Sequence, residues 1–299
     1  MTNLLKLGII GISEGNGHPY SWSSIFNGFD AIEIKKSKFP IIEEYLSLQK
    51  YPDDFINSAT VTHIWTQDYA ESKKIANASK IPNICLDYLD MITKIDALLL
   101  ARDDAQSHFN FAEPFIKVGM PIYIDKPLAL SINEANKLYD LEEGQPQIFT
   151  CSALRFAKEF KISSNTIRRI GEVEFIKAFI PNKWATYAVH VIEPIISQLS
   201  KFRKPTHINF FKKEKKIKFC YSNKNLSFEI FFELFDRKEI KIIIFGNKGE
   251  HTMIFKDSFS AFKKALEMFI EFIITRKNCI SKNDTLDVVR MIEMGNKNV

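Results

Sequence analysis

The chain's 299 residues, 45% of them hydrophobic, are enough for one large or two ordinary domains with sizeable cores. The formal net charge of +5, with one dense basic run at 212–216, excludes a nucleic-acid surface, which needs basic residues across a whole face. No apolar run reaches the roughly 18 residues of a membrane helix, so a membrane protein is excluded as well.

Strand and helix signals alternate through the first half of the chain. Strands are expected at 5–10, 60–66, 83–86, 97–101, 121–125 and 147–152. Helical segments are expected at 19–27, 70–80, 88–92, 106–117 and 131–141. The run 97–101 is continuously apolar, as in strands covered on both faces, and Ser131 with Glu134 forms a capping box. This alternation predicts a doubly wound parallel sheet, a Rossmann domain over residues 1–154.

One connection in this half is unusually long. Residues 29–59 separate the first helix from the second strand, well beyond ordinary loop lengths. Within them, 40–49 carries a proline at its first turn and predicts a helix. This insertion lies near the expected ligand crevice. A lid, an oligomer contact and a plain surface decoration are all consistent with it.

After about residue 155 the pattern changes to consecutive strands. Strands are expected at 173–180, 207–211, 217–221, 226–234 and 239–245. Helices are expected at 160–170, 184–198, 260–276 and 286–293. Several strands in succession predict a large open mixed or antiparallel sheet with helices on one face. We therefore expect a C-terminal α/β domain over 155–299.

A glycine-rich turn follows the first strand. In the dinucleotide fingerprint G-x-G-x-x-G, the first glycine forms the turn, the second admits the pyrophosphate, and the third packs helix against strand. Gly11, Ser13 and Asn16 occupy these places, with Glu14 and Gly15 between them. Because two of the three places differ, an ordinary strand-to-turn connection is the alternative. The position at the start of an alternating half favours a cofactor site at these five residues.

One apolar strand, IYIDKPLAL, contains Asp125-Lys126-Pro127. Together with the opening LKLGIIGISEGNG, it resembles the Gfo/Idh/MocA family of nicotinamide-dependent sugar oxidoreductases, whose signature here is Glu-Lys-Pro. The likeness covers residues 95–130, although Arg102-Asp103 replaces the family's usual Thr-Pro. The resemblance implies a two-domain oxidoreductase with its lysine at the end of a strand, where open α/β sheets bind their ligands.

The resemblance also implies which residues hold NAD or NADP. Beyond the glycine turn, the cofactor-binding candidates are Thr66, Ala101, Arg102, His108, Asp125 and Lys126. Thr66 stands where an acidic residue usually ends the second strand and bonds the ribose hydroxyls. Threonine can bond a hydroxyl or a phosphate oxygen but repels neither. We therefore expect weak discrimination between NAD and NADP, with NAD slightly favoured because the family usually uses it.

Catalytic roles follow from the same resemblance. Lys126 would point at the substrate hydroxyl and stabilise an alkoxide-like transition state. His190 lies in a run that parallels the family's Asp-x-Gly-x-His-x-x-Asp helix, and it would carry the proton. Thr186 replaces the aspartate of that helix, and Glu193 on nearly the same face is another possible partner. Tyr187 is an alternative proton donor, and a hydrogen-bonded core position is the other interpretation of His190.

Three residues are candidate substrate contacts. His18 directly follows the glycine turn, where it could contact the cofactor or the sugar or simply pack at the start of the helix. Arg155 corresponds to a position that borders the family's active site, and an inter-domain salt bridge explains it as well. Trp184 begins the helix that carries His190.

The chain is thus predicted to be an NAD(P)-dependent dehydrogenase or reductase. It would transfer hydride between nicotinamide and a sugar or nucleotide-sugar hydroxyl or ketone, for example in bacterial surface-carbohydrate biosynthesis. A redox-inactive cofactor-binding or regulatory protein and a redox-assisted lyase or glycosidase are the alternatives.

Location and assembly complete the prediction. Cys85, Cys151, Cys220 and Cys279 are far apart, so we expect reduced thiols, no metal site and a cytoplasmic protein. The resemblance implies that the C-terminal domain serves substrate binding and oligomerisation, because the family usually assembles through the exposed face of its second sheet. The aromatic run 228–235 predicts such a face, for a homodimer or homotetramer, with a packed core strand as the other account.

Overall fold

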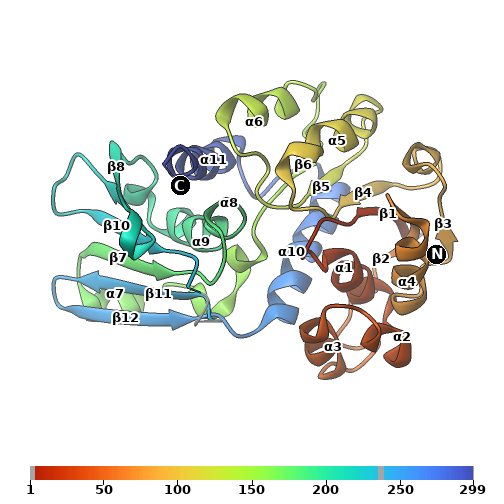
Figure 1. Ribbon diagram of the computed structural model, residues 1–299, viewed down its shortest axis with the longest axis horizontal. Coiled ribbons are helices and arrows are strands. Elements are labelled where there is room, and N and C mark those ends of the chain that lie inside the picture. Colours follow the sequence, from red (N-terminus) through yellow and green to blue (C-terminus); the bar gives the residue numbers. More distant parts are fainter. Residues whose placement is uncertain (1–3, 235–238, 299) are drawn as a thin grey trace. The chain divides into compact units, whose positions relative to one another are not determined.

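The computed structural model describes residues 4–234 and 239–298 (Figure 1). The chain divides into two compact units. Unit 1 comprises Met1–Leu128, Asn136–Thr150 and Phe262–Ile280; unit 2 comprises Ala129–Ala135, Cys151–Ala261 and Ser281–Val299. The sequence placed one boundary at residue 154, close to where the second segment of unit 1 ends. The return of Phe262–Ile280 to unit 1 was not expected, because a helix's apolar pattern does not say which sheet it covers.

Unit 1 is built on a six-stranded parallel sheet. Its strands are β1 (Leu5–Gly11), β2 (Ala59–Thr66), β3 (Asn83–Ile84), β4 (Ala97–Leu100), β5 (Ile122–Ile124) and β6 (Ile148–Phe149). Their order is β3-β2-β1-β4-β5-β6, and every pairing is parallel. This is the doubly wound dinucleotide-binding order, whose direction of winding reverses between β1 and β4. The predicted Rossmann sheet is confirmed.

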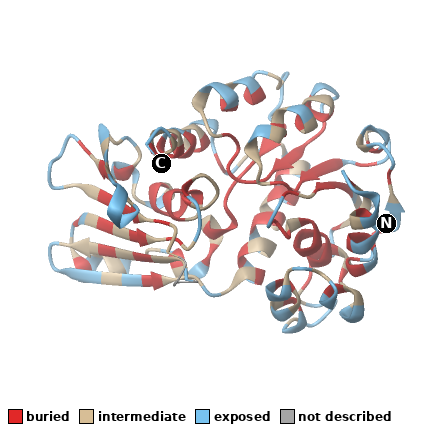
Figure 2. Ribbon diagram, viewed as in Figure 1, coloured by how far each residue is buried: buried red, intermediate tan, exposed pale blue. Residues whose placement is uncertain are grey.

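Helices cover the sheet of unit 1, where strands β4, β5 and β6 are entirely buried and β2 and β3 are partly exposed (Figure 2). The helices are α1 (His18–Asn27), α2 (Ala31–Lys35), α3 (Pro40–Ser47), α4 (Tyr69–Ala78), α5 (His108–Lys117) and α6 (Ile132–Tyr139), whose first residues belong to unit 2, as well as the later part of α10 (Ser258–Thr275). Phe269 of α10 packs on Tyr123 and Phe149, with ring centroids 5.5 and 5.7 Å apart. Continuous burial on both faces explains the apolar runs of these strands.

The insertion at 29–59 packs against α1. It contains α2 and the predicted helix α3, and the hydroxyl of Tyr45 donates to Ser21 Oγ at 2.5 Å. A Cβ added at Gly17 would lie 2.8 Å from Phe39 Cγ, so the glycine admits this close approach. Leu46 is fully buried. These contacts make the insertion part of the core of unit 1.

Unit 2 contains a second six-stranded sheet. Its strands are β7 (Val173–Phe179), β8 (His207–Phe211), β9 (Lys216–Cys220), β10 (Ser227–Phe231), β11 (Lys241–Gly246) and β12 (Gly249–Ile254). The order is β12-β11-β7-β10-β9-β8, parallel only between β7 and β10. The predicted mixed sheet is confirmed. Strand β12 was missed, because GEHTMI is polar and lies largely exposed at the sheet's edge.

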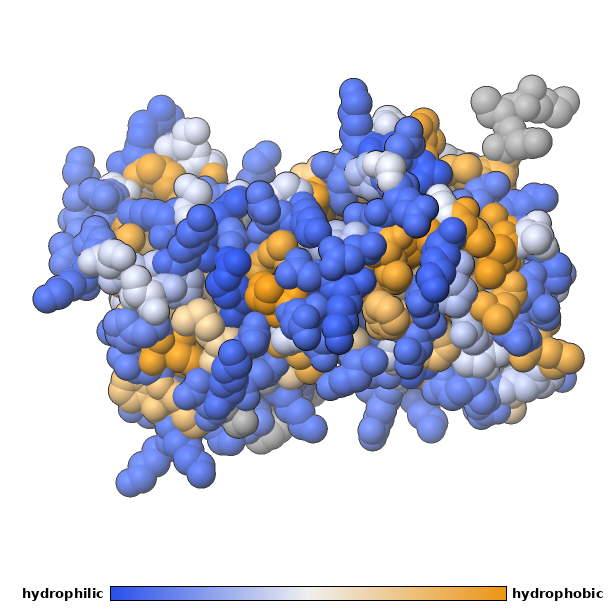
Figure 3. Space-filling view, turned by 90° about the horizontal axis from the view of Figure 1, so that it is seen from above, coloured by the Kyte–Doolittle hydropathy of each residue, from blue (hydrophilic) through white to orange (hydrophobic). Residues whose placement is uncertain are grey.

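The helices of unit 2 are α7 (Ser164–Ile170), α8 (Trp184–Tyr187), α9 (Val189–Gln198) and α11 (Lys282–Asn296), with the start of α10. The predicted helix 184–198 is interrupted at Ala188, where α8 ends and α9 begins. Among the described helices, none is both long and apolar enough to cross a membrane. On the face drawn in Figure 3, hydrophilic side chains predominate and apolar ones lie scattered between them.

The two faces of the second sheet differ. Phe228 and Phe232 are fully buried, and Trp184 packs on Phe232 with ring centroids 5.8 Å apart. On the other face, partly exposed rings stack across strands, as Phe179 does on Phe231 at 5.0 Å. The aromatic run at 228–235 therefore contributes to both faces. Its last residue, Phe235, lies outside the described residues.

Candidate functional site

The turn between β1 and α1 is held from the end of β2. The side chain of Gln67 donates from Nε2 to Ile12 O at 2.7 Å and accepts from Ile12 N at 3.3 Å. Gly15 has a φ of 77°, and a Cβ there would meet nothing within 4 Å, so its backbone faces open space. A Cβ at Gly11 would collide with Pro19 of α1. The turn is thus closely packed at Gly11, against α1, and open at Gly15. Glu14 is exposed.

Ser13, at the second place of the fingerprint, is joined to the loop after β4. Its hydroxyl donates to Asp103 Oδ1 at 2.5 Å and accepts from Asp103 N at 3.1 Å. The other oxygen of Asp103 lies 3.5 Å from Lys126 Nζ, and the Lys126 side chain is only 6% exposed. Sequence reasoning placed Lys126 and Ser13 in the site but assigned no role to Asp103. Asp103 belongs to the same cluster, because its contacts join the residues that follow β1, β4 and β5.

Arg102 is held by neighbours within unit 1. Its guanidinium pairs with both carboxylate oxygens of Asp104, at 2.9 and 2.8 Å, and donates to Gln67 at 3.0 Å. It also lies 5.0 Å from the ring centroid of Phe111. Ala101 is fully buried, and its N–H donates to Ile10 O at 2.8 Å. Ala101 and Arg102, both cofactor candidates, thus fix the loop that follows β4. The guanidinium charge of Arg102 is bonded to neighbouring side chains of unit 1.

His108 is fully buried beneath this loop. Its Nδ1 lies 2.9 Å from Leu128 O and its Nε2 lies 2.7 Å from Arg102 O. Both ring nitrogens therefore face backbone oxygens on either side of the loop. The sequence suggested that His108 binds the cofactor. In this placement the ring instead joins the segments that follow β4 and β5.

Asp125 lies at the centre of the polar cluster and is fully buried. Its Oδ2 accepts from Asn16 Nδ2 at 2.9 Å and from His18 Nδ1 at 2.5 Å, and its Oδ1 accepts from Lys126 N at 2.7 Å. Burial alone would raise the pKa of this carboxyl, but the His18 and Lys126 charges and the two side-chain bonds lower the pKa to about 2. Asp125 is therefore a carboxylate at neutral pH. Its bonds fix the glycine turn to the end of β5.

The end of β2 differs from the expectation. Thr66 is 4% exposed, and its hydroxyl donates to Asp68 O at 2.6 Å and lies 2.9 Å from Ser72 Oγ. The side chain is thus turned into the β2–α4 connection, so the predicted contact of Thr66 with a ribose is not supported by this placement. Asp68 caps α4, its carboxylate accepting from Ala70 N at 2.9 Å.

In unit 2, His190 lies beside a serine hydroxyl. Ser152 Oγ is 2.8 Å from His190 Nδ1, and it also accepts from Leu154 N at 3.2 Å. The ring of Tyr187 meets that of His190 edge-on, at 5.2 Å between centroids. The structure thus brings together His190 and Tyr187, as predicted, and adds Ser152. No motif in the sequence pointed to this serine, which precedes the turn Ala153–Phe156.

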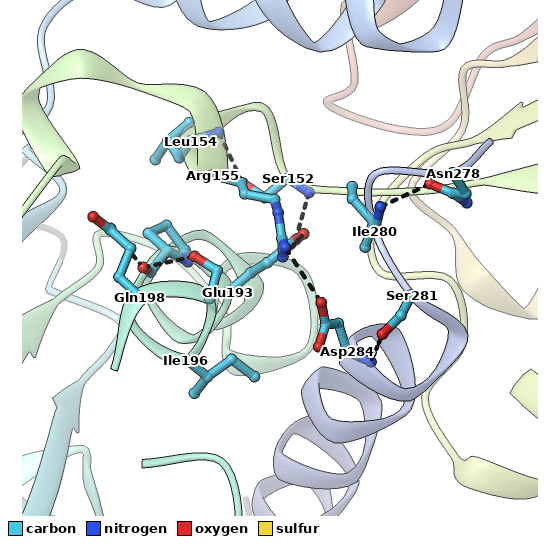
Figure 4. A network of polar contacts seen from close by, with 12 residues as sticks. Ser152, Leu154, Arg155, Glu193, Ile196, Gln198, Asn278, Ile280, Ser281 and Asp284 are labelled. Carbon is cyan, nitrogen blue, oxygen red and sulfur yellow. Dashed lines mark hydrogen bonds and ion pairs between the residues drawn. The ribbon is translucent and has the colours of Figure 1, made fainter. Parts of the chain in front are cut away.

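Glu193 belongs to a chain of buried charges (Figure 4). Its carboxylate accepts from Ser152 N at 2.7 Å and lies 3.4 Å from Arg155 NH1. Arg155 NH2 in turn lies 3.5 Å from Asp284, which also pairs with Arg203. Burial raises the pKa of Glu193 to about 7, although Arg155 and the Ser152 N–H act in the opposite direction. Arg155 thus forms its salt bridges within unit 2, with Glu193 and Asp284.

Trp184 occupies a core position in unit 2. It is 1% exposed, its Nε1 donates to Ile292 O at 3.0 Å, and a Cβ at Gly295 would collide with its ring. This placement does not support the expected substrate contact, because the indole is enclosed by α11 and the inner face of the sheet. Among the described residues, no three His, Cys, Asp or Glu side chains are grouped as a metal site requires.

Residues 41–152 match the model of the oxidoreductase family with an NAD-binding Rossmann fold, GFO_IDH_MocA. Over these residues the chain is similar to the Gfo/Idh/MocA family. The matched segment begins within α3, includes β2 to β6 and contains Lys126, whereas the glycine turn lies before it. The family resemblance read from the sequence is thereby confirmed, as is the class of oxidoreductases with an NAD-binding fold.

One curated protein matches part of this sequence, and solved structures share its fold. The Saccharomyces cerevisiae protein YMR315W is 28% identical over 135 residues, a match covering 42% of this chain and 36% of the yeast protein. Myo-inositol dehydrogenase from Lactobacillus casei superposes with a TM-score of 0.73 at 13% identity, covering 98% of this chain and 94% of that one. Biliverdin reductase from Synechocystis superposes with a TM-score of 0.69 at 14% identity, covering 98% of both chains. At these identities the structural likeness shows the fold.

Proposed function

We propose that this protein is an NAD(P)-dependent dehydrogenase or reductase that acts on a secondary hydroxyl or ketone of a sugar, cyclitol or nucleotide sugar. The observation that carries the proposal is the placement of Lys126 in unit 1. Its ammonium lies at the carboxyl end of β5, beside the turn that follows β1. That edge of a doubly wound sheet is where its ligands bind. Bacterial surface-carbohydrate biosynthesis is one setting for such a reaction.

The β1–α1 turn fits a dinucleotide. Gly15 presents backbone in the left-handed region without a nearby obstacle. At the start of α1 the His18 N–H donates to Asn16 Oδ1 at 2.8 Å and Pro19 has no N–H, so we assign the phosphate contacts to the turn and not to the helix start. Residues 12–17 would hold the pyrophosphate, and the bound nicotinamide would supply the hydride acceptor or donor.

Lys126 would act on the reacting oxygen. Its side chain is 6% exposed, so a charge that develops beside it meets little screening by solvent. A fixed ammonium stabilises an alkoxide more than a neutral hydroxyl, which lowers the barrier of the chemical step. Asp103 holds this ammonium within unit 1.

His190 is the residue at which the family pattern places the proton carrier. Its Nδ1 lies against the Ser152 hydroxyl, which fixes the ring's orientation, and Tyr187 flanks it. An imidazole suits proton transfer near neutral pH. Small polyhydroxylated substrates are supported by the inositol dehydrogenase of similar fold, which was solved with NAD(H) and myo-inositol.

We also propose self-association through the second sheet. Phe175, Phe179, Phe231 and Phe245 stack in pairs on the face away from Trp184, and Lys177 lies 5.2 Å from the ring centroid of Phe175. Partly exposed rings gathered on one sheet face favour contact with a second copy of the same face. Light scattering across a dilution series would test for a homodimer or homotetramer.

A redox-inactive binding protein is the second candidate. It is favoured by the carboxylate of Asp103, bonded to Ser13 where the fingerprint admits a pyrophosphate. The test is fluorescence titration with NADH and NADPH, followed by turnover assays with inositols, hexoses, uronic acids and nucleotide sugars. Binding with turnover supports the dehydrogenase, binding without turnover supports the second candidate, and the absence of both contradicts the two proposals.

A further inference from the structure

His18 and Asp125 form an imidazole–carboxylate pair within unit 1. The two atoms, His18 Nδ1 and Asp125 Oδ2, lie 2.5 Å apart, and the Asp125 side chain is 1% exposed against 16% for His18. The His18 ring stacks on Trp22 at 5.0 Å between centroids and meets Phe262 edge-on at 5.1 Å. A hydrogen bond and two ring contacts therefore fix the imidazole.

The carboxylate decides where the hydrogen on the ring lies. Because the pKa of Asp125 is lowered to about 2, against the raising effect of its burial, by the His18 and Lys126 charges and by bonds from His18 and Asn16, its oxygens only accept hydrogen bonds at neutral pH. Nδ1 must then carry a hydrogen and donate it. In the neutral ring, Nε2 is consequently the basic nitrogen.

Nε2 is the side of the ring that remains available. Among the residues that the structure describes, none forms a hydrogen bond with this atom, and the side chain retains some exposure. His18 begins α1 at the carboxyl edge of the sheet, and the backbone of Lys126 is bonded to the same carboxylate, Asp125. One buried carboxylate thus positions both an imidazole and the residue that carries the ammonium.

We infer that His18 is the general acid and base of this enzyme, with Asp125 as its positioning residue. The inference rests on the proposed dehydrogenase function and assigns to unit 1 a proton-transfer group that the family pattern places at His190. The arrangement is that of a histidine whose Nδ1 is held by a buried carboxylate while Nε2 exchanges the proton.

The proton balance is simple. In oxidation of a carbinol, the O–H bond breaks and its proton passes to His18 Nε2, the C–H electron pair leaves as hydride to the nicotinamide, and a C=O bond forms. In reduction, the imidazolium returns the proton to the oxygen. Asp125 stays ionised in both directions, and its charge stabilises the imidazolium through Nδ1.

The first test needs no substrate. ¹⁵N NMR of ring-labelled protein separates the two neutral tautomers, and the six histidines can be assigned by single substitutions. We expect the neutral His18 ring to carry its hydrogen on Nδ1. In Asp125→Asn, an amide can donate to Nδ1 instead, so the Nε2–H form should gain population. A wild-type ring protonated on Nε2 overturns the inference.

The second test is kinetic, with a sugar from the panel that the wild-type protein turns over. His18→Gln should lower kcat about a hundredfold or more and flatten the pH–rate profile near neutrality, while the Kd for NADH stays close to that of the wild type. His207→Gln is the matched control, since His207 is an exposed histidine of β8. A purely structural His18 would change stability or Kd without changing the pH profile.

The outcomes separate the two proposals. If His190→Gln abolishes turnover and His18→Gln leaves kcat and its pH dependence intact, the inference is wrong and the dehydrogenase stands. If the wild-type protein binds NADH without turnover on any compound, the catalytic role of His18 falls together with the dehydrogenase. Loss of turnover in His18→Gln with retained NADH binding supports the inference.

Discussion

Ser152 Oγ lies 2.8 Å from His190 Nδ1, so a hydroxyl holds the histidine whose counterpart in the family has an aspartate partner. The serine is itself fixed, because its N–H donates to Glu193 and its oxygen accepts from Leu154 N. A hydroxyl orients an imidazole without adding a negative charge. His190 can therefore keep its orientation although Thr186 replaces the aspartate of the helix.

Removing the hydroxyl should release the ring of His190. A lower kcat and a changed pH–rate profile in Ser152→Ala, partly restored in Ser152→Thr because threonine keeps the hydroxyl, would assign the proton to His190. With His18 as the general acid and base, we expect both variants to keep the wild-type pH–rate profile. Ser197→Ala is the control, since Ser197 Oγ donates only along its own helix, to Pro194 O. Equal losses of kcat in the alanine and threonine variants would show that the hydroxyl does not orient His190.

Lys126→Ala should damage turnover far more than cofactor binding. Its proposed role belongs to the transition state, and loss of a preorganised electrostatic group costs on the order of a hundredfold in kcat. Steady-state kinetics and NADH titration on the same preparation measure the two effects separately. Near-normal turnover would remove Lys126 from the mechanism.

The buried carboxyl of Glu193 predicts a pH-dependent stability. Burial is the main cause that raises its pKa to about 7, from an ordinary value of 4.5. Between these values the folded protein binds more protons than the unfolded chain, so stability falls as pH rises through that window, by on the order of 2–3 kcal/mol. Urea unfolding across the window should show the fall in the wild type and a smaller one in Glu193→Gln. Glu14→Gln, at an exposed site, should behave as the wild type does.

Asp103 should weaken dinucleotide binding. Its carboxylate is bonded to Ser13 and pairs with Lys126, so a pyrophosphate at the turn meets a negative charge. We expect Asp103→Asn to tighten NADH binding about tenfold at low salt, with a smaller gain at high salt, because screening weakens the repulsion. Asp90→Asn is the control at an exposed aspartate. Unchanged or weaker binding would mean that Asp103 orders the loop instead.

Discrimination between NAD and NADP should be weak. Thr66 is turned inward, and Asp68 is engaged at the start of α4, so neither is placed to repel a 2′-phosphate. We expect NAD to be slightly favoured, with an affinity ratio below about a hundredfold, or roughly 2.7 kcal/mol. Titrating both cofactors under identical salt measures it. A larger ratio would show that another charged group selects the cofactor.

The sequence predicted the sheets better than the contacts of the site. Apolar runs such as 97–101 predict buried strands because burial acts on each strand alone. The hydrogen bonds of the site join residues far apart in the chain, such as Ser13 with Asp103 and Ser152 with His190. No local pattern encodes such a pairing. The burial of Trp184 was missed for the same reason, because its cover comes from α11, at the other end of the second half.

The return of Phe262–Ile280 to unit 1 affects how this protein can fold during synthesis. Tyr123 and Phe149 receive their cover from Phe269, and the edge of β6 receives a bond from Asn278 to Ile148 O. These residues leave the ribosome long after the strands that they cover. The apolar surface of unit 1 must therefore stay uncovered during synthesis until the residues up to Ile280 have been made.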